Sequence, residues 1–388
     1  MRSERESSAC YLVRYAIGSL GTRPFAAAVC PACATKFESV ESMKRRAGKF
    51  IVVMLALGAG AAMLSMAVHC WRSRNRSDLP YNRGNPVVYD NDEAVDMYTD
   101  EYLLALASLG EIQLHGILTS SPIEPFDRYV SVANYERDVA DREQLVASAK
   151  ASGFANIPDR VRGPMGNLQR PTSGRIEDTR PIGAAGSWLI VTEARKASPE
   201  KPLIVVAGAP LTAEADAYLL DHSIADKVII AWLGGRDRDM CDYNGWADPW
   251  AAYVVLQKLR LVQFPLRVAS PLVPKRQLLD LPAGPLRDYM YHKHHPTNSD
   301  PGDIDGDGPP AISLIRPDYP MVVKRVVFRR WVPCYGSHSH EVPGFYERFE
   351  YYLPWTHPKM ARALVVEKSN QSVSTSEWWR AVRTAMTH

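Results

Sequence analysis

Acidic side chains gather in three short stretches of this sequence. In the first, Asp90, Asp92, Asp96 and Asp100 fall within eleven residues, directly after a short apolar run. Carboxylates so close together repel one another, and a hard cation such as calcium, which takes about six to eight oxygen ligands, relieves that repulsion. The alternative is a solvated acidic loop in which Thr99 or Asp100 caps the next helix. On this stretch alone the two interpretations stand level.

The second stretch, 303–308, reads Asp-Ile-Asp-Gly-Asp-Gly and has the pattern of the start of an EF-hand loop. An EF-hand needs a bidentate glutamate at the last position of its calcium loop, where this chain has Leu314. Pro309 and Pro310 also follow the stretch directly. We therefore reject an EF-hand and expect that one aspartate of this stretch joins the first cluster in space.

The third stretch, 242–252, combines a polar segment with the start of a helix. Asp248 followed by Pro249 predicts a helix N-cap with proline at the first helical position. Asp242 and Asn244 come earlier, shortly after a Gly-Gly pair that ends an apolar run. There the two side chains can donate to and accept from the hydroxyl groups of a polyhydroxylated ligand.

The elements around these stretches alternate between strand and helix. Continuous apolar runs predict strands, and the segments between them predict helices, as follows: strands at 86–89, 112–118, 203–207, 228–233 and 262–266, and helices at 100–109, 213–220 and 249–259. Strands that are apolar on both faces are typical of a mostly parallel sheet flanked by helices. Ligands bind at the carboxyl ends of the strands in such sheets. The sequence therefore predicts an α/β, Rossmann-like fold with the first and third stretches at the ligand-binding edge.

Composition narrows the class of protein. The chain has 388 residues, is 46% hydrophobic and 23% charged, and has a formal net charge of +3. These values exclude a disordered chain, a collagen and a protein with many membrane spans. No strong basic field indicates a nucleic acid partner, and six cysteines are too few for a disulfide-stapled scaffold. A homo-oligomer is compatible with this composition.

The residues before the first predicted strand read differently. Phe50 to Val68 is an apolar run with Ser65 as its polar member, and a basic segment at 44–49 precedes it. This layout fits either a secretory signal peptide or a membrane anchor. The expected organisation is an upstream extension or disordered segment at 1–42, a start at Met43, the signal or anchor at 43–70, a linker at 71–85 and the folded domain at 86–388. The protein is then exported, and periplasmic or membrane-anchored.

The order of these motifs resembles the inosine–uridine-preferring nucleoside hydrolases. That family opens with a strand and Asp-x-Asp-x-x-x-Asp-Asp, against which this chain has Asp90 to Met97 and then Asp100. Three short motifs follow in the family's order: Leu114 to Thr119, Gly208 to Ala213 and Leu233 to Gly235. The most specific match sets Asp242 to Ala252 against Glu-Phe-Asn-x-x-x-Asp-Pro-x-Ala-Ala. The resemblance spans about residues 86–320 and implies a nucleoside-hydrolase-like fold.

The resemblance also implies roles for single residues. Asp92 would lie beside a calcium ion and act as general base for the attacking water. The backbone carbonyl of Thr212 and the carboxylate of Asp307 would bind the same calcium. Asp242 and Asn244 would bind the ribose hydroxyls.

The sequence departs from the family at two of these places. The family's paired aspartates correspond to Asp96 and Met97. Either Asp96 holds one role and a short insertion delivers Asp100 to the other, or one ligand is lost. Asp96 and Asp100 are both counted among the expected calcium ligands, and Asp96 also among the expected substrate-binding residues. The family's histidine before the late aspartate is Gly306 here, so the usual acid for the leaving group is missing from its place. Three histidines between 292 and 295 could substitute, although a polar surface loop is the favoured interpretation of that stretch.

Together these features predict a calcium-dependent enzyme that hydrolyses the N-glycosidic bond of a nucleoside or related riboside. In the implied mechanism calcium orients and acidifies a water, Asp92 accepts its proton, and the ribosyl group passes through an oxocarbenium-like state. Two alternatives stay open. One is a non-catalytic nucleoside or carbohydrate binder on the same fold, which Met97 and Gly306 favour. The other is a hydrolase of a different glycosyl compound.

Overall fold

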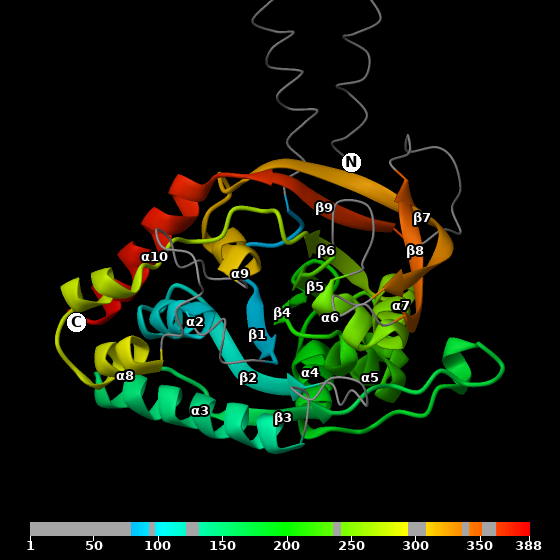
Figure 1. The fold of residues 1–388 in the computed structure, drawn as a ribbon, viewed down its shortest axis with the longest axis horizontal. Helices are drawn as coiled ribbons and strands as arrows, with labels where there is room; N and C mark the ends of the chain where they lie inside the picture. The colour runs from blue at the N-terminus through cyan, green and yellow to red at the C-terminus, as the bar shows by residue number, and fades with distance from the viewer. Residues whose placement is uncertain are drawn as a thin grey trace, which may run out of the picture. The chain divides into compact units, whose positions relative to one another are not determined.

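A sheet of nine strands runs through the part of the chain that the computed structural model describes (Figure 1). That part comprises residues 79–92, 98–121, 132–235, 242–293, 308–335, 341–350 and 362–388. All of it belongs to one unit, Trp71–His388. The strands are β1 (Pro86–Asn91), β2 (Gln113–Ser121), β3 (Arg160–Met165), β4 (Leu203–Gly208), β5 (Val228–Leu233), β6 (Arg260–Phe264), β7 (Pro320–Tyr335), β8 (Glu341–Glu350) and β9 (Arg362–Ser369). The helices are α2 (Tyr98–Ser108), α3 (Val132–Ala151), α4 (Ala185–Lys196), α5 (Thr212–Leu220), α6 (Tyr243–Ala247), α7 (Pro249–Lys258), α8 (Pro285–Lys293), α9 (Gly308–Ile315) and α10 (Gln371–Ala385), with 3-10 turns η4 (Ile176–Asp178), η5 (His222–Ile224) and η6 (Lys275–Asp280).

The sheet is mostly parallel. Its strand order is β3-β2-β1-β4-β5-β6-β9-β7-β8. From β3 to β9 every neighbouring pair is parallel, whereas β7 runs antiparallel to both β9 and β8. Every residue of β4 and of β5 is buried, as expected of strands with helices on both faces. The predicted α/β class, with a mostly parallel sheet flanked by helices, is confirmed.

Two layers of helices enclose the sheet, and alternate strand residues point to one layer or the other. In β1, Val87 and Tyr89 pack in one core with side chains from α2, α3, α8, α9 and α10. Val88 lies between them and packs in the other core, with α4, α5 and α7. In β4, Ile204 and Val205 divide between the two cores in the same way. Figure 1 shows α2, α8 and α10 on one side of the central strands and α4, α5 and α7 on the other.

The two halves of the sheet diverge between β1 and β4. The chain continues from β1 to β2 and β3 in one direction, and from β4 to β5 and β6 in the other. The carboxyl ends of β1 and β4 therefore form a topological switch point, which is where open α/β sheets bind ligands. The register sets Asn91, the last residue of β1, opposite Gly208, the last residue of β4.

The apolar pattern predicted the central strands closely. The strand predicted at 228–233 is β5 at the same bounds, and the one predicted at 203–207 is β4 with one further residue. The strand predicted at 262–266 is β6, which ends at Phe264. It stops there because Pro265 begins a turn, closed by a 2.9 Å hydrogen bond from the Val268 N–H to the Pro265 carbonyl.

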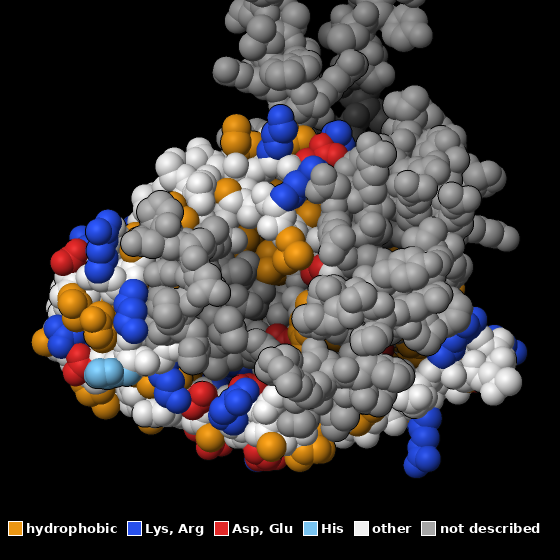
Figure 2. All heavy atoms as spheres, in the orientation of Figure 1, with side chains coloured by type: hydrophobic (Ala, Val, Ile, Leu, Met, Phe, Trp, Pro, Cys, Tyr) orange, Lys and Arg blue, Asp and Glu red, His pale blue; other side chains and the backbone are white. Residues whose placement is uncertain are grey.

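The described helices differ from membrane-spanning helices in length or hydropathy. No helix in the described ranges is long and apolar enough to cross one, and the apolar segment 50–68 lies outside those ranges. Figure 2 shows Lys and Arg side chains scattered among acidic and apolar ones on the visible described surface. The charge on this face is therefore spread rather than gathered into one patch.

Candidate functional site

Two buried carboxyl groups lie beneath the switch point. Asp90, in β1, is fully buried and accepts a 2.7 Å hydrogen bond from the Ser120 hydroxyl on one oxygen. Its other oxygen, and both carboxylate oxygens of Glu214 in the first turn of α5, have no hydrogen-bond partner within the described ranges. Burial raises the pKa of both groups, and the negative charge of Asp90 raises the pKa of Glu214 further. Both carboxyl groups therefore favour the protonated form over the ionised one.

Asp92 follows directly at the carboxyl end of β1. Its side chain is buried, with 4% of the residue exposed. The charge of Asp92 helps to raise the pKa of Arg142, so the carboxylate lies within electrostatic range of that guanidinium. Asp92 is thus placed at the switch point, where open α/β sheets bind ligands.

Arg142 is a buried cation that the sequence analysis did not single out. It lies on α3, and its side chain is 1% exposed. Its Nε donates to Asp100 Oδ2 at 2.8 Å, and its Nη1 donates to the Asn91 carbonyl at 3.0 Å and to Thr119 Oγ1 at 3.1 Å. One guanidinium therefore joins α3 to α2 and to the carboxyl ends of β1 and β2.

Asp100 is the acidic partner of that ion pair. Burial raises the pKa of its carboxyl group, while Arg142 and the Tyr89 hydroxyl act in the opposite direction. Thr99 and Asp100 both lie inside α2, so neither is its N-cap, and the capping alternative for the acidic stretch is wrong. Asp100 is held next to β1, as a ligand-binding role requires, but one of its oxygens is already occupied by Arg142.

Asp248 connects the β4 side of the site. It is fully buried and caps α7 through a 3.0 Å bond from the Ala251 N–H, as the sequence predicted. It also accepts from the Leu168 N–H and from Thr212 Oγ1, both at 2.8 Å. Burial raises its pKa to about 6 despite these three donors. Asp248 thereby fixes Thr212 at the start of α5, directly beyond β4.

Asp242 and Asn244 complete the same edge of the sheet. Asn244 Nδ2 donates to the carbonyls of Gly208 at 3.1 Å and Leu233 at 3.0 Å, the last residues of β4 and β5. Asp242 caps α6 by accepting from the Gly245 N–H at 2.8 Å. Both side chains are buried at the ligand-binding edge, and each uses part of its hydrogen-bonding capacity to hold the local backbone.

Not all predicted site residues can be located. Asp92, Asp100, Thr212, Asp242 and Asn244 share the carboxyl edge of the sheet, whereas positions 96 and 307 lie outside the described ranges. The oxygen atoms near this edge fit a hard cation in part, because buried carboxylate oxygens of Asp90 and Glu214 have no hydrogen-bond partner among the described residues. Among the described side chains, no group of three or more His, Cys, Asp or Glu is arranged to hold a metal ion.

Solved structures with this fold include nucleoside hydrolases. The Inosine-Guanosine Nucleoside Hydrolase (IG-NH) has a TM-score of 0.53 and 17% identity, and the match covers 78% of this chain and 98% of that one. The Purine-Preferring Ribonucleoside Hydrolase from Gardnerella vaginalis has a TM-score of 0.54 and 15% identity, with 78% and 99% covered. The type III effector protein XopQ, solved with adenosine diphosphate ribose, has a TM-score of 0.50 and 13% identity, with 83% and 98% covered.

These comparisons identify the fold. No protein-family model matches the sequence, and no curated protein matches it. The chain has the α/β fold of the nucleoside hydrolases, at sequence identities at which a likeness shows the fold alone.

Proposed function

We propose that this protein hydrolyses the N-glycosidic bond of nucleosides or related ribosides, with Asp92 as the general base and calcium as the cofactor. The observation that carries the proposal is the buried Asp92 carboxylate at the switch point of a sheet with the nucleoside hydrolase fold. The acidic stretch that continues from it, and Thr212 beyond the neighbouring strand, supply the oxygen donors that calcium prefers.

Calcium would be held by Asp92, Asp96, Asp307 and the Thr212 carbonyl, with Asp100 as a further ligand through its oxygen not bonded to Arg142 Nε. When bound, it would acidify a coordinated water. Asp92 would then accept the water proton, and Asp242, Asn244 and Asp96 would hold the ribose hydroxyls.

The buried acids beneath the site contribute through their charge. The developing ribosyl cation would be favoured by the negative potential of Asp92 and, when ionised, of Asp90 and Glu214. Arg142 works against this potential, because its positive charge sits among the same carboxylates. The balance between these charges would set how strongly the site stabilises the oxocarbenium-like state.

Release of ribose from a nucleoside panel by the full chain, with and without a calcium chelator, tests this function. We expect release that the chelator suppresses and that Asp92→Ala reduces about 100-fold or more, the usual contribution of a general base. Asp159→Ala is the matched control, because that carboxylate is 89% exposed and pairs with Lys150 on the surface. Chelator-insensitive release, or full activity of Asp92→Ala, would contradict the proposed mechanism.

A second candidate function is binding of a nucleoside or carbohydrate without turnover. The observation that favours it is the Arg142–Asp100 ion pair, which occupies an oxygen that a catalytic calcium site would use. In that case calorimetry would detect saturable nucleoside binding by a protein that releases no ribose from any member of the panel.

We also propose that the folded domain is exported from the cytoplasm. The basic segment followed by the apolar run 50–68 supports a signal peptide or membrane anchor ahead of the folded domain. The substrate would then be met outside the cytoplasm, in the periplasm or at a membrane surface.

A further inference from the structure

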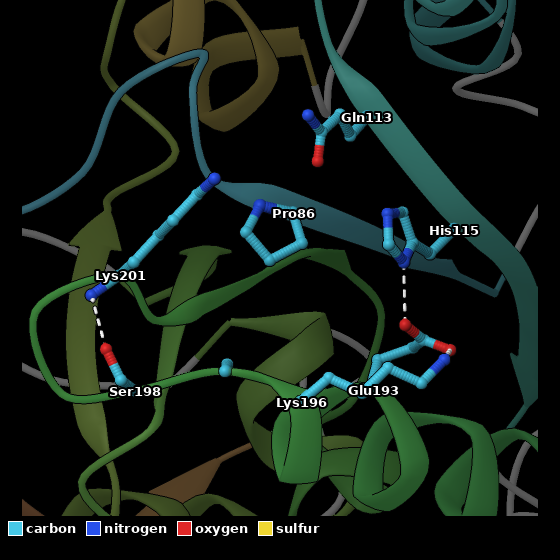
Figure 3. Close-up of a pocket in the computed structure, with 8 residues that line it drawn as sticks. Pro86, Gln113, His115, Glu193, Lys196, Ser198 and Lys201 are labelled. Carbon is cyan, nitrogen blue, oxygen red and sulfur yellow. Dashed lines mark hydrogen bonds and ion pairs between the residues drawn. The ribbon is translucent and has the colours of Figure 1, made fainter.

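A cavity of about 310 Å³ opens at the edge of the sheet opposite the candidate site (Figure 3). It is lined by Pro86 and Gln113, the first residues of β1 and β2, and by side chains from the end of α4 and the turn after it. The amino ends of the strands form this edge, whereas the candidate site lies at their carboxyl ends. The cavity is therefore independent of the proposed hydrolysis.

The charge of the one acidic group in the described cavity lining is balanced by a neighbouring lysine. Glu193 accepts from His115 Nδ1 at 2.6 Å on one oxygen and from Lys196 Nζ at 2.7 Å on the other. Burial opposes ionisation of Glu193, but these two partners outweigh it and hold its pKa below the usual range. The carboxylate thus has both oxygens engaged and stays charged, and Lys196 balances its charge.

Two donors remain to face the cavity. The Lys201 ammonium and the Gln113 amide nitrogen have no hydrogen-bond or ion-pair partner for their side chains within the described ranges, and the second ring nitrogen of His115, whose Nδ1 donates to Glu193, is an acceptor in the neutral ring. Figure 3 shows the Lys201 side chain extending toward Pro86, with Gln113 and His115 on the other side of Pro86.

The Lys201 backbone is held in place. Its N–H donates to the Ser198 hydroxyl at 3.1 Å, and its carbonyl accepts from the Ser198 N–H at 3.3 Å. The turn that carries the ammonium is therefore fixed by two bonds, which lowers the loss of entropy when a ligand binds.

The chemistry of this lining selects an anion. Two ammonium groups face a single carboxylate, and the Lys201 ammonium and the Gln113 amide nitrogen are still able to donate. The carbonyl end of α4 is unfavourable to negative charge, so an anion would lie on the Lys201 side of the cavity. The volume is at the lower end of the range for small-molecule pockets, about 300–1,000 Å³.

We propose that this cavity binds a phosphate group, as inorganic phosphate or as a small phosphate monoester, through the Lys201 ammonium and the Gln113 amide nitrogen. Phosphate offers several acceptor oxygens to donors that converge from separate elements. Lys196 and Glu193 form the neutral wall that keeps the His115 ring oriented.

Calorimetric titration of the full chain with inorganic phosphate, at an ionic strength held constant with potassium chloride, tests this proposal. We expect saturable binding that Lys201→Ala weakens about ten-fold, the effect of losing one charge-assisted contact, while Lys201→Arg retains it. Lys368→Ala, at an exposed lysine on β9, is the matched control and should bind as the unaltered chain does. Asp92→Ala should also leave phosphate binding unchanged, which separates this proposal from the proposed hydrolysis.

A parallel titration with ribose 5-phosphate distinguishes the two sources of the phosphate group. Tighter binding than for inorganic phosphate identifies a monoester as the ligand, and equal or weaker binding identifies free phosphate. A titration without saturation would overturn the proposal, as would an affinity that Lys201→Ala leaves unchanged in a variant that melts like the parent.

Discussion

Replacing Arg142 by methionine should strongly destabilise this protein. The substitution keeps most of the aliphatic volume but removes three hydrogen bonds, to Asp100, to the Asn91 carbonyl and to Thr119. It also leaves the Asp100 carboxylate buried without its counter-ion, since the two side chains are only 1% and 2% exposed. Breaking a buried ion pair in this way costs about 3–5 kcal/mol. We therefore expect the free energy of unfolding to fall by about that amount.

Urea denaturation at neutral pH, followed by tryptophan fluorescence, measures this loss. Arg137→Met is the matched control on the same helix, because Arg137 is 64% exposed and lies 3.7 Å from its partner Asp138. Because the Arg137 guanidinium is exposed and the contact is long, its loss should cost less than about 1 kcal/mol. Adding Asp100→Asn to Arg142→Met should recover part of the loss, since the stranded charge is then absent. Equal losses for Arg142→Met and Arg137→Met, or no recovery in the double variant, would refute the reasoning.

Two further predictions concern Asp248. Asp248→Ala should lower the free energy of unfolding by about 2–4 kcal/mol, because it removes a helix cap and leaves the Thr212 hydroxyl and the Leu168 N–H buried without an acceptor; an unchanged melting temperature would contradict this. The pKa of Asp248 is raised to about 6 in the folded state, whereas it is about 3.9 in the unfolded chain. The stability that protonated Asp248 contributes is therefore complete below about pH 4 and is lost as the pH rises through about 6. The unfolding free energy of the parent should fall between about pH 4 and 7, measured in chelator, and in Asp248→Asn this fall should be smaller by up to about 3 kcal/mol. Identical pH profiles for the parent and the variant would argue against a buried, titrating Asp248.

The sequence predicts the centre of this fold because burial on both faces leaves a local signal. β4 and β5 are short apolar runs that are buried throughout. A run so short and continuous, bounded by turn residues, is typical of a strand buried on both faces rather than of a helix. The capping role of Asp248 can also be predicted from the sequence, since an aspartate followed by a proline is typical of a helix N-cap.

Other elements carry no such signal. α3 is polar overall, and its buried residues are interspersed with exposed ones, so its pattern does not separate a packed helix from a solvated one. β3 includes a proline and exposed residues, as the outermost strand on its side of the sheet. The strands β7 and β9 pair with each other across a long separation in sequence, which no local pattern encodes.

The same distinction explains which site residues the sequence reveals. Asp92, Thr212 and Asn244 are predicted as site residues because they belong to motifs read along the chain, and all three are buried at the carboxyl edge of the sheet. Arg142 was missed because its meaning depends on partners 42 and 51 residues away, Asp100 and Asn91. On its own, an arginine in a polar helix predicts a solvated side chain on the protein surface.

The position of Arg142 also bears on how the site handles charge. A site that binds a divalent cation needs carboxylates whose repulsion is relieved only when the cation arrives. Here part of that repulsion is relieved permanently, because the guanidinium bonds to Asp100 and lies within electrostatic range of Asp90 and Asp92. The fold of the site is then less dependent on a bound cation, and the cation in turn gains less by binding. The affinity for calcium should therefore be weaker than that of a site with the same carboxylates and no arginine, and the two candidate functions of this chain differ in whether the remaining affinity suffices for catalysis.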